Sequence, residues 1–181
     1  MNIREAEACS RFIRSRPMHF KTADLCDVYS EQLKIAEPIF HDYGGRTGFA
    51  GQLRTVKARE DNSRVREALE EAGEGRVLVV DGDGSRRCAM LGDRLAELAH
   101  INGWSGVIVF GCIRDAAEIG YIDIGVKALA THPRKSDKRG EGERDVPVEF
   151  AGIRFTPGHY VYADRDGIVV ATAELSLSDG E

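Results

Sequence analysis

Residues 76–115 read RVLVVDGDGSRRCAMLGDRLAELAHINGWSGVIVFGCIRD and contain a strand pattern, a helix pattern and a second strand pattern. The runs RVLVVDG (76–82) and GVIVFGC (106–112) are almost wholly apolar, which is typical of strands buried on both faces of a parallel sheet. Between them, the apolar spacing predicts a helix from about Ala89 to Asn102, ended by Gly103. This order predicts a right-handed crossover between parallel strands, and therefore an α/β fold with a parallel core sheet.

The chain before this unit is expected to form helices and one strand. Thr22 is expected to cap one helix, and either Asp61 or Asn62 another, because short polar side chains favour the N-cap position. Gly73 would end the second of these helices. The expected elements are a charged helix at 3–15, a helix from Thr22 to about Lys34, a strand at Leu53–Val56 with its flanks, and a helix at 63–72.

The chain after the second strand is expected to become rich in β-structure. A third core strand is predicted at 124–131, followed by the polar loop HPRKSDKRGEGERD at 132–145. Its run Arg134–Arg139 is interpreted as a solvated face, with docking of an acidic or RNA-bearing partner as the alternative. Short strands are predicted at 146–150, 153–155, 160–163 and 168–171.

The length of 181 residues favours one domain with a core of ordinary size. We expect a single domain at 21–173, an N-terminal helical extension at 1–20 and a flexible tail at 174–181. The first twenty residues contain no apolar signal region and the chain contains no 18-residue apolar run, so we expect a cytoplasmic protein that does not contact a membrane.

Composition narrows the possible partners and cofactors. Lys and Arg total 25 against 30 Asp and Glu, and this net charge of -5 argues against direct binding of nucleic acid. The cysteines at 9, 26, 88 and 112 form no CxxC pair, so a zinc site is not indicated and buried free thiols are expected.

Polar residues follow the two core strands, at the edge of a parallel sheet where ligands gather. One cluster is DGDGS at 81–85, which matches neither GxGxxG nor GxxxxGK[ST] and is better explained as a turn. The other is Arg114-Asp115. The helix after the first strand would add its free first-turn amides, which bind carboxylates or phosphates well.

Arg114-Asp115 has two interpretations. Asp115 is either an N-cap of the next short helix beside a solvated arginine, or a ligand for Mg²⁺, which commonly takes one or two carboxylates and keeps its waters. In the second case the guanidinium offers its planar fork to the oxygens of a 2-oxo acid or an enolate. With the helix-start amides near Gly92–Leu95, these groups would converge on a small anionic oxo acid.

Twenty residues separate Asp93 from the pair Arg114-Asp115. This spacing resembles the D-x20-R-D signature of class II 4-hydroxy-4-methyl-2-oxoglutarate aldolases, which belong with the proteins named regulator of ribonuclease activity A. The resemblance covers about residues 21–171. The segments that carry it include TADLCDVY (22–29), EPIFHDYGGRTGFAGQLRTVK (37–57), EDN (60–62), RVLVVDGDGS (76–85), DIGVKAL (123–129), GERDV (142–146) and YADRDGIVV (162–170).

The resemblance implies a swivelling β/β/α sandwich, similar to phosphohistidine domains, that assembles into homotrimers or dimers of trimers. It implies cleavage of 4-hydroxy-4-methyl-2-oxoglutarate to two pyruvates and decarboxylation of oxaloacetate, with Mg²⁺ or Mn²⁺ as cofactor. By position, Asp115 would hold the metal and Arg114 would bind the keto-acid oxygen. The backbone of Gly92, Asp93, Arg94 and Leu95 would hold the carboxylate, and the Asp93 side chain would contact metal-bound water.

The same resemblance offers an alternative, because the regulator members bind ribonuclease E and inhibit RNA processing. Asp115, which some regulators lack, favours the lyase over this alternative. A third label used for this family, menaquinone methyltransferase, is rejected because no glycine-rich S-adenosylmethionine loop follows a first strand.

Overall fold

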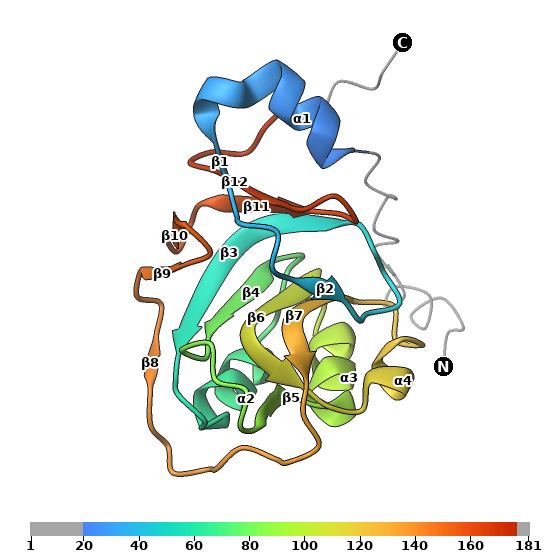
Figure 1. The fold of residues 1–181 in the computed structure, drawn as a ribbon, viewed down its shortest axis with the longest axis vertical. Helices are drawn as coiled ribbons and strands as arrows, with labels where there is room; N and C mark the ends of the chain where they lie inside the picture. The colour runs from blue at the N-terminus through green and yellow to red at the C-terminus, as the bar shows by residue number, and fades with distance from the viewer. Residues whose placement is uncertain (1–19, 177–181) are drawn as a thin grey trace, which may run out of the picture.

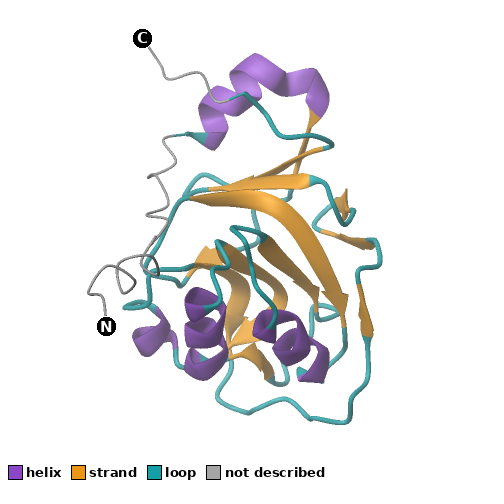
Figure 2. Ribbon diagram, turned by 180° about the vertical axis from the view of Figure 1, so that it is seen from behind, coloured by secondary structure: helices purple, strands orange, loops and turns teal. Residues whose placement is uncertain are grey.

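The computed structural model describes residues 20–176 and consists of three layers. A parallel sheet of β3 (Phe49–Lys57), β4 (Val77–Asp81), β6 (Gly106–Ile113) and β7 (Gly125–Thr131) forms the centre. The helices that connect these strands cover one face, and C-terminal strands cover the other (Figures 1 and 2). The predicted α/β sandwich with a parallel core sheet and a β-rich C-terminal third is confirmed.

The parallel strands are connected through helices, as the alternating patterns predict. Helix α2 (Ser63–Glu70) lies between β3 and β4, α3 (Asp93–Ile101) between β4 and β6, and α4 (Ala116–Ile119) between β6 and β7. Strand β4 is buried at every position. Leu78 and Val80 pack toward the helices, whereas Val77 and Val79 pack toward the C-terminal strands, so the continuous apolar run serves two cores.

Strand β3 belongs to the central parallel sheet and also pairs with the antiparallel C-terminal strands, and Figure 1 shows its long curved course. Its residues Leu53–Lys57 pair in parallel with β4, whereas Phe49–Gln52 pair antiparallel with β11 (Tyr160–Ala163). The remaining strands are β1 (Leu33–Ile35), β2 (His41–Asp42), β5 (Ala89–Leu91), β8 (Glu143–Arg144), β9 (Val148–Phe150), β10 (Ile153–Phe155), β11 (Tyr160–Ala163) and β12 (Ile168–Ala171).

The helix predicted at 89–102 begins four residues late. Residues Ala89–Leu91 form strand β5, which pairs in parallel with β6, and α3 begins at Asp93. Apolar residues in one short run fit a buried strand as well as a buried helix turn, and pairing with β6 decides between them. Gly92 therefore lies at the N-terminus of the helix.

The helix predicted from Thr22 to Lys34 is also shorter. Helix α1 ends at Tyr29, a 3-10 turn spans Ser30–Gln32, and β1 pairs with β12. Thr22 does not cap the helix, because its hydroxyl donates to Asp164 Oδ1 at 2.6 Å.

The predicted N-terminus of α2 is confirmed, since Asp61 Oδ1 accepts from the Ser63 amide at 2.9 Å, although α2 ends at Glu70. The predicted helix at 3–15 lies outside the described residues, as does most of the predicted tail.

The charged side chains of the run Arg134–Arg139 are exposed, as predicted, but the backbone of the loop after β7 is held in place. The Asp61 carboxylate, fully buried, accepts from the Arg139 amide at 2.6 Å and the Glu141 amide at 3.4 Å. The Asp137 amide donates to Glu60 O at 2.9 Å, and β8 pairs with the end of β3. The loop is therefore fixed to the segment that follows β3.

Gly44 is required by a close backbone contact. A Cβ at this position would lie 2.0 Å from Ile124 O, whereas a Cβ at Gly48 would meet nothing within 4 Å. Gly44→Ala is therefore expected to lower the free energy of unfolding by about 3 kcal/mol, as overpacking against fixed backbone does. Chemical denaturation with Gly48→Ala as the matched control checks this. Equal stabilities of the two variants would contradict it.

The described cysteines Cys26, Cys88 and Cys112 are free, as predicted, and of these Cys88 and Cys112 are buried while Cys26 is partly exposed. Within residues 20–176, no helix is long and apolar enough to cross a bilayer.

Candidate functional site

The predicted site residues lie where two neighbouring strands end and two helices begin. Gly92 joins β5 to α3, and Arg114-Asp115 joins β6 to α4. Because β5 and β6 are paired, these junctions are adjacent: the Arg114 amide donates to Leu91 O at 2.9 Å. The structure thus places Gly92, Asp93, Arg114 and Asp115 at one edge of the parallel sheet.

The Asp115 carboxylate lies between the start of α3 and the Arg114 side chain. Its Oδ2 accepts from the Asp93 amide at 3.3 Å and lies 3.6 Å from Arg114 Nε. Among the described residues, Asp115 Oδ1 has no hydrogen-bond or ion-pair partner. The Asp115 side chain is 35% exposed, so the carboxylate lies partly at the surface.

Gly92 allows this close arrangement. A Cβ at Gly92 would lie 2.8 Å from Asp115 Oδ2 and 3.4 Å from Arg114 Nε. A side chain there would push the carboxylate or the guanidinium away from the start of α3. The absence of a side chain at Gly92 therefore leaves room for the Asp115 carboxylate and the Arg114 guanidinium beside the start of α3.

The backbone of Asp115 distinguishes the two interpretations of its side chain. Asp115 precedes α4 and its carbonyl accepts from the Ile119 amide at 3.0 Å, but its side chain makes no capping hydrogen bond to α4. It adopts the left-handed conformation, φ 56 and ψ 41, which is uncommon outside glycine and costs about 1 kcal/mol. The residue caps α4 through its backbone while its carboxylate is directed toward α3.

The other predicted residues, Arg94 and Leu95, continue the first turn of α3. Leu95 has a buried side chain, so only its backbone could serve a ligand, whereas Arg94 is exposed. Asp93 Oδ1 accepts from the Arg94 amide at 2.7 Å. A depression between α3 and α4 is lined by Asp93, Arg94, Glu97, Glu118 and Ile122.

Three residues of that depression, Glu97, Glu118 and Ile122, were not predicted. Glu97 follows Asp93 by four positions, and this helical spacing is the signal that could have identified it. Glu118 carries no such signal, because its place depends on how α4 packs.

The cluster DGDGS at 81–85 forms a turn and does not join this site. Asp81 Oδ1 accepts from the Asp83 amide at 2.9 Å, and both Asp83 and Gly84 have positive φ. Burial raises the pKa of Asp81. Among the described residues, no hydrogen bond or ion pair links this turn to Arg114 or Asp115.

The donor set suits a hard cation that keeps most of its water. Within residues 20–176, no three His, Cys, Asp or Glu side chains gather as a metal site. Zn²⁺ in a closed structural site would need four protein ligands. Mg²⁺ is held by one or two carboxylates together with water or substrate oxygens, and Asp115 and Asp93 can supply these.

The chain matches the family model described as RraA-like, Aldolase/RraA, over residues 22–170. A protein of Alkalilimnicola ehrlichii is 60% identical over 158 residues, covering 87% of this chain and 98% of its own. A protein of Ectopseudomonas mendocina is 56% identical over 90% of this chain and 100% of its own. Both carry the provisional name 4-hydroxy-4-methyl-2-oxoglutarate aldolase.

Solved structures with different names share the fold. A Geobacillus kaustophilus structure titled as an S-adenosylmethionine: 2-dimethylmenaquinone methyltransferase is 56% identical, with a TM-score of 0.86 over 89% of this chain and 100% of that one. A Thermus structure titled as the RNA-processing inhibitor RraA is 44% identical, with a TM-score of 0.85 over 90% and 99%.

Proposed function

The chain belongs to the RraA-like, Aldolase/RraA family, and from this membership we propose that it is a divalent-metal-dependent lyase acting on small 2-oxo acids. The substrates proposed are 4-hydroxy-4-methyl-2-oxoglutarate, which would be cleaved to two pyruvates, and oxaloacetate, which would be decarboxylated. The observation that carries the proposal is the Asp115 carboxylate between the α3 amides and Arg114, with Oδ1 available to a ligand.

Asp115 would hold Mg²⁺ or Mn²⁺ through its available oxygen, and Asp93 would contact a water on the metal. The cation, when bound, would neutralise negative charge that develops on the oxo-acid oxygens. Carboxylate oxygens such as those of Asp115 and Asp93 are ligands that suit Mg²⁺ and Mn²⁺.

The chain's own groups would bind and orient the substrate. The first-turn amides of α3, from Gly92 to Leu95, offer donors to the carboxylate next to the keto group. Arg114 offers its planar fork to the keto oxygen. In this orientation the bond to be broken joins the methylene beside the keto carbon to the next carbon, so its electron pair can move onto the keto oxygen that is stabilised.

Bond cleavage then requires little more than charge stabilisation. The hydroxyl of the substrate gives its proton to a water molecule, its carbon becomes the keto carbon of the first pyruvate, and the bond to the neighbouring methylene breaks. The released electron pair forms the enolate of the second pyruvate, which takes a proton from water. Decarboxylation of oxaloacetate releases carbon dioxide and leaves the same enolate. Arg114 would stabilise that enolate in both reactions.

Pyruvate release tests the proposal directly. The purified protein is expected to release pyruvate from both substrates with Mg²⁺ or Mn²⁺, and to lose this activity with excess chelator because charge on the enolate is no longer neutralised. Restoring the metal should restore the rate. A lactate dehydrogenase-coupled assay measures the product, and a rate that chelator leaves unchanged would contradict metal dependence.

The assembly proposed is a homotrimer or a dimer of trimers, with the glycine-rich segment 44–51 as a candidate contact. Light scattering at micromolar concentration would give a multiple of three chains, and a monomer mass would contradict it.

The similarity to the Thermus structure titled RNA-processing inhibitor RraA supports a second candidate, binding of ribonuclease E. If exposed charges such as Lys138 and Arg139 mediate this binding, it would weaken with added salt, because exposed contacts are screened within about 8 Å at physiological ionic strength. Capture of ribonuclease E by both the wild type and Asp115→Asn, without pyruvate release by either, would favour the regulator. Metal-dependent pyruvate release without capture would favour the lyase.

A further inference from the structure

The depression between α3 and α4 adjoins the start of α3, and most of its charged residues are acidic. Its volume is about 450 Å³, which leaves room for a small oxo acid and for water, since one water occupies about 30 Å³. Asp93 belongs both to this depression and to the predicted site, because its amide contacts the Asp115 carboxylate. The other lining residues are Arg94, Glu97, Glu118 and Ile122.

The two proposed reactions differ in their need for a proton acceptor. In cleavage of 4-hydroxy-4-methyl-2-oxoglutarate the substrate hydroxyl must lose its proton, because its carbon becomes a keto carbon. Decarboxylation of oxaloacetate removes no hydroxyl proton, since the group that leaves is an ionised carboxylate. A positioned side chain that accepts a proton typically contributes a factor of about 10² to 10⁴ in rate. Aldol cleavage therefore asks for a residue that decarboxylation does not need.

Glu97 is placed to accept this proton by way of a water molecule. It follows Asp93 by four positions within α3, so the two residues lie on the same face of the helix. Side chains on a helix lean toward its N-terminus, which for α3 is the end beside Asp115. Glu97 is exposed and lines the depression, so its carboxylate meets water there.

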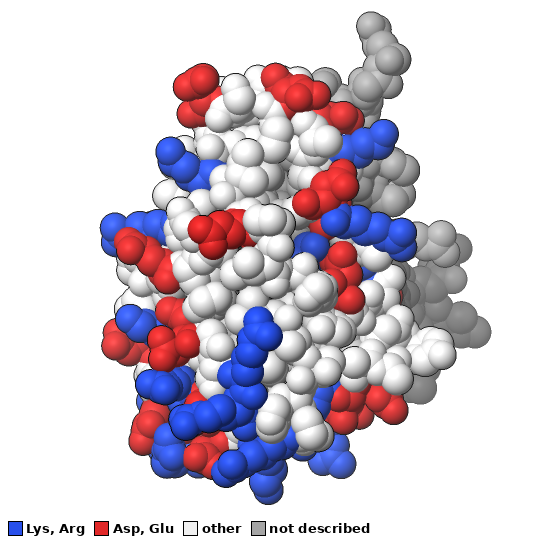
Figure 3. Space-filling model, viewed as in Figure 1, with Lys and Arg blue, Asp and Glu red and all other residues white. Residues whose placement is uncertain are grey.

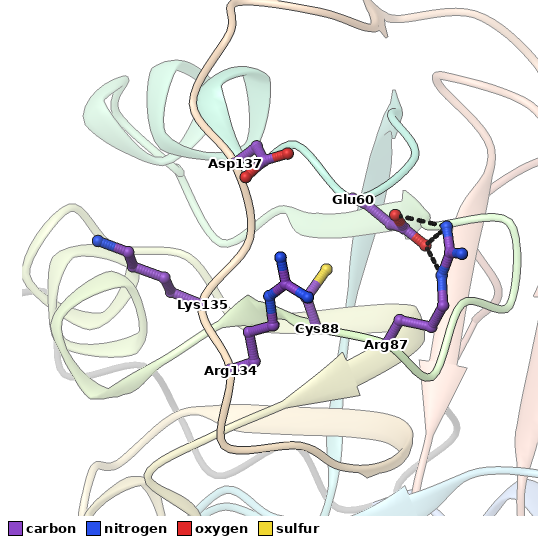
Figure 4. A pocket seen from close by; sticks show the side chains of 6 residues that line it. All are labelled: Glu60, Arg87, Cys88, Arg134, Lys135 and Asp137. Atoms are coloured by element: carbon purple, nitrogen blue, oxygen red, sulfur yellow. Dashed lines mark hydrogen bonds and ion pairs between the residues drawn. The ribbon is translucent and has the colours of Figure 1, made fainter.

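Several carboxylates elsewhere on the molecule are engaged by basic side chains. A second pocket lies on the loops that precede β5 and follow β7, and Figure 4 shows its Glu60 in contact with Arg87. Glu60 accepts from Arg87 Nε at 2.7 Å, and Asp137 of the same pocket lies 2.7 Å from Arg139. Figure 3 likewise shows acidic and basic side chains side by side at the lower end of the molecule. A paired carboxylate is a weaker proton acceptor, because its partner favours the charged form.

The Glu97 carboxylate has no such partner. In the part of the chain that the structure describes, its side chain makes no ion pair and no hydrogen bond, although Arg94 lies three positions before it in the same depression. Arg64 and Glu67 of α2 have the same spacing and do pair, at 2.8 Å. Both carboxylate oxygens of Glu97 are therefore left to water.

Glu118 is the other unassigned carboxylate of the depression, and its position fits this role less well. It follows Asp115 by three positions, but Asp115 has a left-handed backbone and precedes the first turn of α4. The helical spacing rule therefore does not bring Glu118 beside the Asp115 carboxylate, which is directed toward α3.

We propose that Glu97 is the proton acceptor for aldol cleavage in this chain, an inference that rests on the proposed lyase function. The substrate hydroxyl gives its proton to a water molecule in the depression, and this water passes a proton to the Glu97 carboxylate. The bond from the hydroxyl-bearing carbon to the neighbouring methylene breaks, and its electron pair forms the enolate. Glu97 then returns the proton through water to the methylene carbon, so the cycle neither gains nor loses a proton.

Turnover of both substrates by Glu97→Gln tests the proposal. We expect kcat for 4-hydroxy-4-methyl-2-oxoglutarate to fall about a hundredfold, which is the contribution of a positioned base. Its KM should stay within about threefold, because the variant removes a group that acts in the chemical step and not in substrate binding. Oxaloacetate decarboxylation should also stay within about threefold, since it needs no proton acceptor. Glu97→Asp keeps a carboxylate and should retain at least about a tenth of the wild-type kcat.

The controls separate a chemical role from a structural one. Glu70→Gln makes the same change on α2, where Glu70 lies 3.8 Å from Arg66, and should leave both rates unchanged. Isothermal titration with pyruvate and Mg²⁺ should give the same affinity for Glu97→Gln as for the wild type. Equal losses with both substrates, or a loss in Glu118→Gln but not in Glu97→Gln, would overturn the proposal. Absence of turnover of either substrate by the wild type would instead remove the lyase function on which the proposal rests.

Discussion

Asp115→Asn is expected to reduce pyruvate release at least about a thousandfold, because the variant removes the charge that would hold the metal. A bound cation contributes several kcal/mol to stabilisation of developing charge, and about 4 kcal/mol corresponds to three orders of magnitude in rate. Asparagine has nearly the shape of aspartate and tolerates the left-handed backbone at φ 56, so the link between β6 and α4 should persist.

Asp83→Asn is the matched control for this variant. Asp83 also has a positive φ and lies in a loop after a core strand, but it contacts Arg59 and not the start of α3. It should retain the wild-type rate. Steady-state kinetics at saturating Mg²⁺ compare the rates of both variants with that of the wild type, and the thermal unfolding midpoint of each variant shows whether its fold is intact. An Asp115→Asn rate within tenfold of the wild type, with the fold intact, would remove Asp115 from the metal site.

Arg114→Lys is expected to lower the rate about a hundredfold while preserving the charge. Arginine presents a planar fork that can contact the keto oxygen in two places, whereas lysine presents a compact ammonium on a flexible chain. Loss of a donor that stabilises an enolate costs about 3 kcal/mol, which is roughly two orders of magnitude.

The division between kcat and KM identifies the role of Arg114. If the guanidinium acts mainly on the enolate, kcat should fall much more than KM rises. Arg66→Lys, on the exposed side of α2, makes the same chemical change away from the site and should have no effect. A rise in KM alone would assign Arg114 to substrate binding and not to the chemical step.

The core of the fold could be predicted from the sequence because its signals are local. The runs at 76–82 and 106–112 are apolar at nearly every position, and only strands between two packed layers need such a pattern. Site residues at the strand ends follow from the parallel arrangement, which brings the ends of paired strands to one edge.

The errors arose where distant residues decide local structure. Ala89–Leu91 is a strand because β6 offers pairing partners, and Leu33–Ile35 is a strand because β12 does. Thr22 has the side chain of an N-cap, but Asp164 binds its hydroxyl. The charged side chains of the loop after β7 are exposed, as their composition predicts, but the contact of its backbone with the buried Asp61 was not foreseen. None of these partners could be identified from neighbouring residues.

The dual pairing of β3 has a consequence for the order of folding during synthesis. Its second half can pair once β4 emerges, but Ala50 must wait for Tyr162. Strand β1 likewise waits for β12. The edges of β1 and of the first half of β3 therefore remain unpaired until β12 and β11 have been made. Such non-local pairing slows folding, and a nascent chain with exposed edges depends on chaperones or dilution to avoid aggregation.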